Sequence, residues 1–223
     1  MAAHELRTPI QPILGLSGVL QSKIKDKELY ALIDIIGRNA KRLQRLTEDI
    51  LDVTRIESHS LRLRKEEFNL NDVIINCIND ITTNRNYDTK GKDDVKILYE
   101  PRDIFLKADK ERLSQVISNL LSNAFKFTTN GTISISSDKR DSQVEVMIKD
   151  TGTGIDQDLF LRLFTKFASK SYSGTGLGLF ITKSIIEAHG GKIWAENNTD
   201  GNGATFTFNL PINEKVVFNT DGK

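Results

Sequence analysis

The chain has 223 residues, a length typical of one or two globular domains. Hydrophobic residues make up 38% and charged residues 27%, which argues against a disordered or fibrous protein. Lys and Arg total 31 against 30 Asp and Glu, so a net charge of +1 supplies no strong field for nucleic acid or an anionic membrane. One cysteine excludes an internal disulfide, and no apolar run reaches the ~20 residues of a membrane-spanning helix. We therefore expect a soluble, cytoplasmic chain that binds no nucleic acid and contains no membrane segment.

The apolar residues of the first 64 positions have helical spacing. Those before residue 25 fit one amphipathic helix, with Pro9 and Pro12 near its start. Those after residue 28 form two interleaved series seven residues apart, Leu29, Ile36, Leu43, Ile50 and Leu32, Leu46, Val53. This apolar seam predicts a second helix over about 27–57 that packs against other helices. The short connection over 22–28 makes the two helices an antiparallel hairpin.

A hairpin of two helices buries too little surface to be stable alone. We therefore expect a homodimer, in which the hairpins of two copies form a four-helix bundle. The alternative is that the hairpin packs against the second domain of its own chain.

Residues 65–213 alternate between strand-like and helical patterns and predict a mixed α/β domain. The expected strands are 95–100, 132–136, 143–149, 192–196 and 204–210. The expected helices are 72–81, 109–127 and 177–189. Residues 62–68 are polar and charged, and we expect them to form the hinge and the first edge of this domain. The tail 214–223 shows no clear element.

The first cluster that could carry chemistry is His4-Glu5, followed by Thr8-Pro9. A helical histidine beside a carboxylate, next to a turn that Pro9 loosens, could be a nucleophile whose free ring nitrogen attacks. Taken alone, a histidine this close to a terminus is more often a solvated surface residue.

The second cluster lies on the predicted helix 109–127. Asn119, Asn123 and Lys126 are spaced i, i+4 and i+7 and therefore share its polar face. Two amide oxygens one turn apart suit a Mg²⁺ ion that bridges phosphates, and a lysine one turn further suits the phosphate charge. A solvated helix face is the plainer interpretation, but two asparagines in the middle of a helix are unfavourable enough to need a reason.

The third cluster consists of glycine-rich segments. Asp150-Thr-Gly-Thr-Gly-Ile155 follows a predicted strand, Gly174-Thr-Gly-Leu-Gly-Leu179 opens a predicted helix, and Gly201-Asn-Gly203 precedes the last strand. Glycines let backbone N–H groups approach phosphates. The sequence has neither the dinucleotide fingerprint nor the lysine-containing phosphate loop, so a nucleotide would need a different cradle.

In this order, the segments resemble the catalytic core of a two-component sensor histidine kinase. The family's H, N, G1, F and G2 boxes correspond to His4–Pro9, Asn119–Phe127, Asp150–Gly154, Phe164–Phe167 and Gly174–Leu179, and 201–206 resembles its closing G3 element. The resemblance implies an α+β chain. A dimerisation and phosphoacceptor hairpin over 1–64 would be followed by a Bergerat-type (GHKL) ATP-binding α/β sandwich over 65–213.

The resemblance also implies a role for each residue of the hairpin motif and of the helix face. His4 would be the phosphoacceptor and Glu5 its general base, while Thr8 would orient water for phosphatase action. Asn123, helped by Asn119, would hold Mg²⁺. Lys126 would contact phosphate and Phe127 would lie against adenine.

Asp150 would accept the adenine amino hydrogen, and Gly152, Gly154 and Ile155 belong to the segment that permits this approach. The segment that would border the triphosphate consists of Gly174, Thr175, Gly176, Leu177, Gly178 and Leu179. Phe164 and Phe167 would pin a mobile lid.

ATP and Mg²⁺ are the cofactors that the family implies, and the receiver domain of a response regulator is the implied partner. Two alternatives stay open. An ATP hydrolase of the gyrase, chaperone or mismatch-repair kind would need a glutamate where Asn119 stands, and a dimeric scaffold would need no catalysis. The chain begins three residues before His4, so we expect a fragment whose parent could be membrane-anchored.

His189 lies outside these clusters. It precedes Gly190-Gly191 and fits the end of the predicted helix 177–189. There a partly charged ring would interact favourably with the helix dipole.

Overall fold

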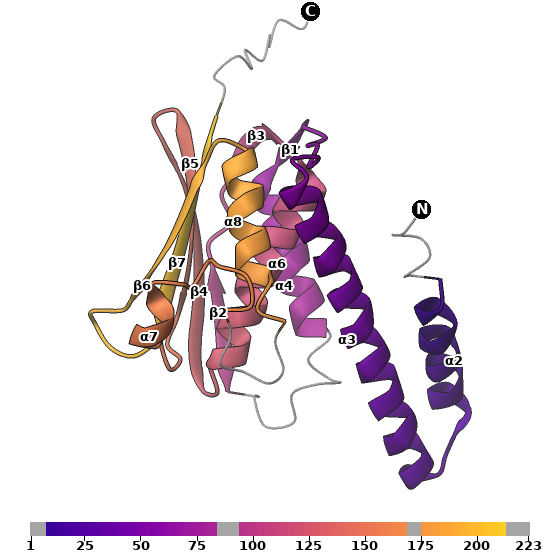
Figure 1. The fold of residues 1–223 in the computed structure, drawn as a ribbon. Helices are drawn as coiled ribbons and strands as arrows, with labels where there is room; N and C mark the ends of the chain where they lie inside the picture. The colour runs from indigo at the N-terminus through magenta and orange to yellow at the C-terminus, as the bar shows by residue number, and fades with distance from the viewer. Residues whose placement is uncertain (1–7, 84–93, 169–174, 213–223) are drawn as a thin grey trace, which may run out of the picture. The chain divides into compact units, whose positions relative to one another are not determined.

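The computed structural model describes residues 8–83, 94–168 and 175–212. The chain divides into two compact units, Met1–Leu61 and Arg62–Lys223, and each is described here by itself (Figure 1). Among the predicted site residues, His4, Glu5 and Gly174 lie outside the described residues, as does the tail 214–223.

The first unit is the predicted helical hairpin. It consists of α2 (Ile10–Lys23) and α3 (Lys27–Glu57), so the range predicted from the apolar seam is confirmed for α3. Pro12 lies in the first turn of α2, where a missing N–H breaks no helical hydrogen bond. Asp26 caps α3, because its carboxylate accepts hydrogen bonds from the backbone N–H groups of Glu28 and Leu29 at 3.0 and 2.9 Å.

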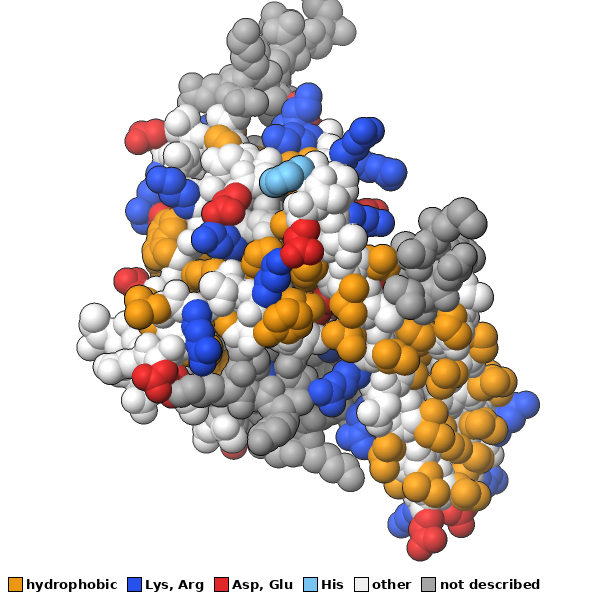
Figure 2. All heavy atoms as spheres, viewed as in Figure 1, with side chains coloured by type: hydrophobic (Ala, Val, Ile, Leu, Met, Phe, Trp, Pro, Cys, Tyr) orange, Lys and Arg blue, Asp and Glu red, His pale blue; other side chains and the backbone are white. Residues whose placement is uncertain are grey.

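The apolar seam of α3 is largely exposed in a single chain. Its exposed members, each between 46% and 57% accessible, are Leu29, Leu32, Ile36, Leu43 and Ile50. Small residues make the contact with α2 instead, since a Cβ added to Gly37 would lie 3.3 Å from the Ser17 hydroxyl oxygen. Figure 2 shows hydrophobic side chains gathered over the hairpin. A continuous stripe of large apolar side chains is typical of an interaction surface.

The second unit is an α/β sandwich, as predicted, with helices over one face of a five-stranded sheet (Figure 1). In spatial order the strands are β2 (Val95–Tyr99), β4 (Gly131–Arg140), β5 (Gln143–Asp150), β7 (Ala204–Pro211) and β6 (Lys192–Asn197). The β2–β4 pair is parallel and the other pairs are antiparallel. The covering helices are α4 (Leu70–Thr83), α6 (Lys110–Phe127) and α8 (Gly178–Ala188).

Alternation along β5 positions the first site residue. Val144, Val146, Ile148 and Asp150 are buried and alternate with partly exposed neighbours. The strand register pairs Asp150 with Ile133 of β4, which is also buried. Asp150 therefore continues an apolar series, and its carboxyl group ends on the buried face of the sheet, where the residue is only 3% exposed.

Two short elements were not predicted in full. β1 (Glu66–Asn69) pairs antiparallel with β3 (Phe105–Ala108), whereas the sequence analysis predicts a polar edge over 62–68 and no strand at 105–108. Phe105 is apolar but 54% exposed, so the sequence of β3 does not show the apolar–polar alternation that a strand prediction needs, although its burial alternates. The single-turn helix α7 (Gln157–Phe160) was also not predicted.

Candidate functional site

One face of α6 carries the three polar residues that the spacing predicts together. Asp109 caps this helix by accepting a hydrogen bond from the Arg112 N–H at 3.1 Å, and the opposite stripe of the helix is buried in the core. Asn119, Asn123 and Lys126 are each partly buried. The Lys126 ammonium lies 5.3 Å from the centroid of the adjacent Phe127 ring, and partial burial lowers the pKa of Lys126.

The two asparagines differ in what they contact. The Asn119 Nδ2 group donates to the Thr182 hydroxyl of α8 at 2.9 Å, while its Oδ1 accepts no hydrogen bond from the described residues. A Cβ added to Gly178 would lie 2.4 Å from that Oδ1, so the Asn119 side chain lies directly against the start of α8. The amide of Asn123 makes no hydrogen bond to any residue that the structure describes. Both side chains therefore keep an amide oxygen for a ligand.

Asp150 presents a buried carboxyl group at the end of β5. Its Oδ1 accepts hydrogen bonds from the backbone N–H groups of Gly152 at 2.9 Å and Ala204 at 3.3 Å. Burial raises the pKa of Asp150, and the two N–H groups offset part of that rise. Both bonds go to the same oxygen, which leaves Oδ2 as an acceptor for another donor.

The glycines after β5 and before β7 are required by contacts between backbones. A Cβ on Gly152 would lie 2.3 Å from the Phe127 carbonyl oxygen, which also accepts a hydrogen bond from the Thr153 N–H at 3.2 Å. A Cβ on Gly203 would lie 2.0 Å from the Asp150 carbonyl oxygen. Gly154 has a positive φ of 75°, which a side chain would strain. The end of α6, the loop after Asp150 and the start of β7 thus form one closely packed corner.

Two asparagines that the sequence analysis missed hold this corner together. Asn197 binds both backbone groups of Ile155, accepting from its N–H at 2.6 Å and donating to its carbonyl at 2.8 Å. Asn198 donates to the Asp150 carbonyl at 2.7 Å and accepts from the Thr205 hydroxyl at 2.7 Å. The sequence feature that could have indicated them is their position, two adjacent asparagines between the predicted strand 192–196 and the glycines 201 and 203.

The segment that carries the predicted lid phenylalanines is in contact with the described part of the second glycine-rich segment. Phe164 is partly buried, and Phe167 is 72% exposed with a positive φ of 61°. A Cβ on Gly176 would lie 2.7 Å from the Phe167 backbone, so these two segments touch.

The start of α8 follows directly. Leu177 is buried, and its N–H donates to the Thr175 hydroxyl at 3.3 Å. Leu179, in the first turn, is partly buried. α8 begins without a side-chain cap, so its first N–H groups are available to an anion.

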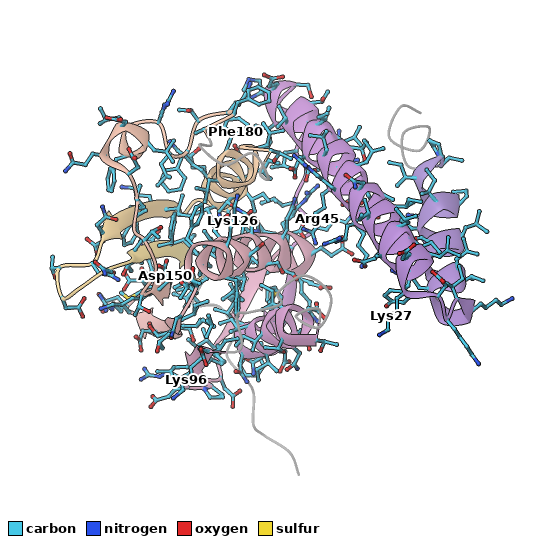
Figure 3. The ribbon with its side chains drawn as sticks, turned by 90° about the horizontal axis from the view of Figure 1, so that it is seen from below. Lys27, Arg45, Lys96, Lys126, Asp150 and Phe180 are labelled. Carbon is cyan, nitrogen blue, oxygen red and sulfur yellow. The ribbon has the colours of Figure 1, made fainter. Side chains whose placement is uncertain are left out.

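Figure 3 labels Lys126 on α6, Asp150 at the end of β5 and Phe180 on α8, three neighbouring elements of this unit. Together they offer amide oxygens, an ammonium group, a buried carboxyl and helix N–H groups, which suit a nucleotide phosphate chain and base. No group of three or more His, Cys, Asp and Glu side chains that could hold a metal occurs within 8–83, 94–168 and 175–212. Asn119 cannot accept a proton from water as a glutamate would, which argues against the ATP hydrolase alternative.

His189 caps the end of α8, as predicted, but the prediction of a partly charged ring was wrong. The residue is 6% exposed and its Nε2 accepts a hydrogen bond from the Asp109 N–H at 3.0 Å, which only a neutral ring can do, and burial lowers its pKa. Among the helices that the structure describes, none combines the length and apolarity of a bilayer-spanning segment.

Comparison with known families agrees with the two units. Residues 1–59 match the His Kinase A (phospho-acceptor) domain, and residues 108–214 match the histidine kinase-, DNA gyrase B- and HSP90-like ATPase. The sensory/regulatory protein RpfC of Xanthomonas campestris is 34% identical over 94% of this chain and 30% of its own length. The chain thus spans less than a third of the length of the curated relatives that it matches.

Solved structures give the same result. Full-length ShkA in complex with AMPPNP has a TM-score of 0.76 at 26% identity, over 95% of this chain and 44% of ShkA. The catalytic domain of the histidine kinase ThkA has a TM-score of 0.59 at 36% identity, over 67% of this chain and 96% of that domain. ThkA in complex with the response regulator protein TrrA has a TM-score of 0.62 at 33% identity, over 95% of this chain and 60% of that chain. On these matches the chain belongs to the sensor histidine kinases and carries their phosphoacceptor and ATPase-like domains.

Proposed function

We propose that this chain transfers the γ-phosphoryl group of ATP to His4 and then to an aspartate of a response-regulator receiver domain. The observation that supports this most is the corner where Asp150, the polar face of α6 and the uncapped start of α8 meet. Phosphoryl transfer depends mainly on positioning and charge stabilisation, and these groups supply both for a bound triphosphate.

In this proposal the base and the phosphates bind different parts of the corner. The carboxylate of Asp150 accepts the adenine amino hydrogen, and burial raises the pKa of this carboxyl group above its ordinary value. Phe127, 44% exposed, lies against adenine. Lys126 contacts phosphate, and the N–H groups of α8 at Gly178 face the triphosphate.

We propose that Asn123 and Asn119 hold Mg²⁺ through their Oδ1 atoms. The amide oxygens fit because neither accepts a hydrogen bond from the described residues, and oxygen is the ligand that Mg²⁺ prefers. The ion would neutralise charge on the phosphates. Since the described residues contain no group of three or more His, Cys, Asp and Glu side chains that could hold a metal, the two asparagines and the nucleotide would share the ion between them.

The hairpin supplies the acceptor in this proposal. His4 attacks as a neutral imidazole with Glu5 as its base, and Thr8 orients water when the chain acts as a phosphatase on the regulator. The exposed seam of α3 supports a homodimer through residues 1–64. The boundaries 1–64, 65–213 and 214–223 and a cytoplasmic location remain predictions.

Labelling with γ-labelled ATP tests the assignment. His4→Gln should abolish acid-labile, alkali-stable labelling and leave calorimetric nucleotide affinity unchanged, because the acceptor is lost and the nucleotide corner is not. His59→Gln is the matched control, since His59 is an exposed histidine after α3. Labelling of the His4 variant at the level of the His59 variant would refute the proposal.

A further inference from the structure

Asp109, at the start of α6, joins three segments of the second unit. Its Oδ1 accepts from the Arg112 N–H within α6, and its Oδ2 accepts from the Arg64 N–H at 2.8 Å. Its own N–H donates to Nε2 of His189 at 3.0 Å. Arg64 belongs to the predicted hinge segment and His189 is the C-cap of α8, so one 6% exposed residue connects the hinge segment and both helices of the nucleotide corner.

The hydrogen bonds of His189 define its protonation state. Nδ1 lies 2.8 Å from the Ile185 carbonyl oxygen and must carry the hydrogen, because a carbonyl only accepts. Nε2 must carry a lone pair, because it faces the N–H of Asp109. A second proton on the ring would place a hydrogen on Nε2 against that N–H, and the bond would be lost.

The surroundings of His189 include charges of both signs. A cavity of about 190 Å³ borders the ring, and its lining includes Lys65 of the hinge segment and Lys107 of β3. α6 contributes the Asp109 carboxylate, whereas β7 contributes only Leu210 and Pro211 to the cavity. Burial, and to a smaller extent Lys65, disfavour a charged ring more than the Ile185 carbonyl and the Asp109 carboxylate favour it, so the pKa of His189 lies below its ordinary value.

We propose that neutral His189 is a positioning residue for the nucleotide corner, and that its protonation in mild acid weakens nucleotide binding. This rests on the proposed function. Asp109 is the N-cap of α6, which carries Asn119, Asn123 and Lys126 further along, and His189 is the C-cap of α8, which begins beside Asn119. When the Asp109–His189 bond breaks, α6 and α8 lose one of the points that join them, and the spacing between Asn119 and Gly178 then depends on the Asn119–Thr182 hydrogen bond and on packing.

The test compares the full wild-type chain with His189→Gln and His189→Ala in calorimetric titrations with AMPPNP and Mg²⁺ between about pH 8 and about pH 5.5. Glutamine has a donor and an acceptor like neutral histidine but does not titrate. As the pH falls, the wild-type affinity should fall more than that of His189→Gln, and the difference should approach at most about tenfold once the ring is protonated, as expected for one lost hydrogen bond. His189→Ala should bind AMPPNP more weakly than the wild type at every pH. If this variant does not fold, the comparison of the wild type with His189→Gln decides whether the inference holds.

Amide exchange supplies a readout that nucleotide chemistry does not affect. In the wild type, the exchange rate of the Asp109 N–H divided by that of the Ile181 N–H in α8 should rise as the pH falls. In His189→Gln this ratio of rates should stay constant. Equal pH profiles of affinity in these two proteins would overturn the inference while leaving the proposed function intact. A wild-type chain that binds no nucleotide at any pH would overturn both.

Discussion

Replacing Gly152 by alanine tests the geometry of the nucleotide corner most directly. The added Cβ would lie 2.3 Å from the Phe127 carbonyl oxygen, 2.7 Å from its carbon and 3.0 Å from Asp150 Oδ1. Because the first contact joins backbone to backbone, the end of α6 and the loop must separate by roughly 1 Å. This separation breaks the Thr153 N–H bond to Phe127 and strains the Gly152 N–H bond to Asp150.

The expected loss of stability follows from these contacts. Overpacking costs about 1–3 kcal/mol, and a hydrogen bond to a charged group contributes about 1.5–3 kcal/mol. Gly152→Ala should therefore lower the free energy of unfolding by about 3–5 kcal/mol and reduce nucleotide affinity at least about tenfold, since Asp150 and Phe127 both move.

Urea unfolding followed by the fluorescence of the single tryptophan, Trp194 in β6, measures the stability of this unit, and calorimetry measures the affinity. Gly190→Ala is the matched control for stability. Gly190 has a φ of 85°, but a Cβ there would meet only Pro211 at 3.6 Å, so backbone strain alone should cost about 1–2 kcal/mol. The reasoning is refuted if Gly152→Ala is no less stable than Gly190→Ala, or if it keeps wild-type affinity.

Three further substitutions test separate features. Burial raises the pKa of Asp150, so its ionised form destabilises the fold as the pH rises through that pKa. Asp150→Asn should therefore unfold at a higher urea concentration than the wild type at about pH 8, and this difference in stability should be smaller at about pH 4. The variant should also lose affinity for adenine nucleotides. A variant that is less stable than the wild type at about pH 8 would contradict the reasoning. Asn198→Ala removes bonds to Asp150 and Thr205 and should cost about 2–3 kcal/mol in urea unfolding, whereas Asn202→Ala, at an exposed position, should cost under about 0.5 kcal/mol. Asp26→Ala removes the cap of α3 and should lower hairpin stability by about 1 kcal/mol in thermal circular dichroism, while Asp26→Asn should lose less.

The features that the sequence predicted best are those with a long, regular signal. The apolar seam runs through several heptads, and it gave the range of α3 because packing demands that repeat throughout. The shared face of Asn119, Asn123 and Lys126 follows from helix geometry alone. Burial of Asp150 was not predicted, because the expected strand ended at residue 149, although the alternation of β5 accounts for it.

The features that were missed depend on partners far away in the sequence. Asn197 and Asn198 bind residues 42 and 48 positions earlier, and a local pattern cannot indicate such pairs. The neutral state of His189 depends on the N–H of Asp109, which is 80 residues away. β3 is four residues long and pairs with an equally short strand, so alternation has too few positions to be recognised.

The corner collects ionisable groups whose charged forms are disfavoured by burial in the chain alone. A fourth apolar residue after Val144, Val146 and Ile148 would complete the inner face of β5, yet a carboxyl group with a raised pKa stands there. Lys126 has its pKa lowered by burial, so its charge is also unfavourable in the chain alone. A ligand that donates a hydrogen to Asp150 and brings negative charge to Lys126 offsets both costs at once. An adenine nucleotide has these two features, so its binding should stabilise the unit more strongly above the pKa of Asp150 than below it.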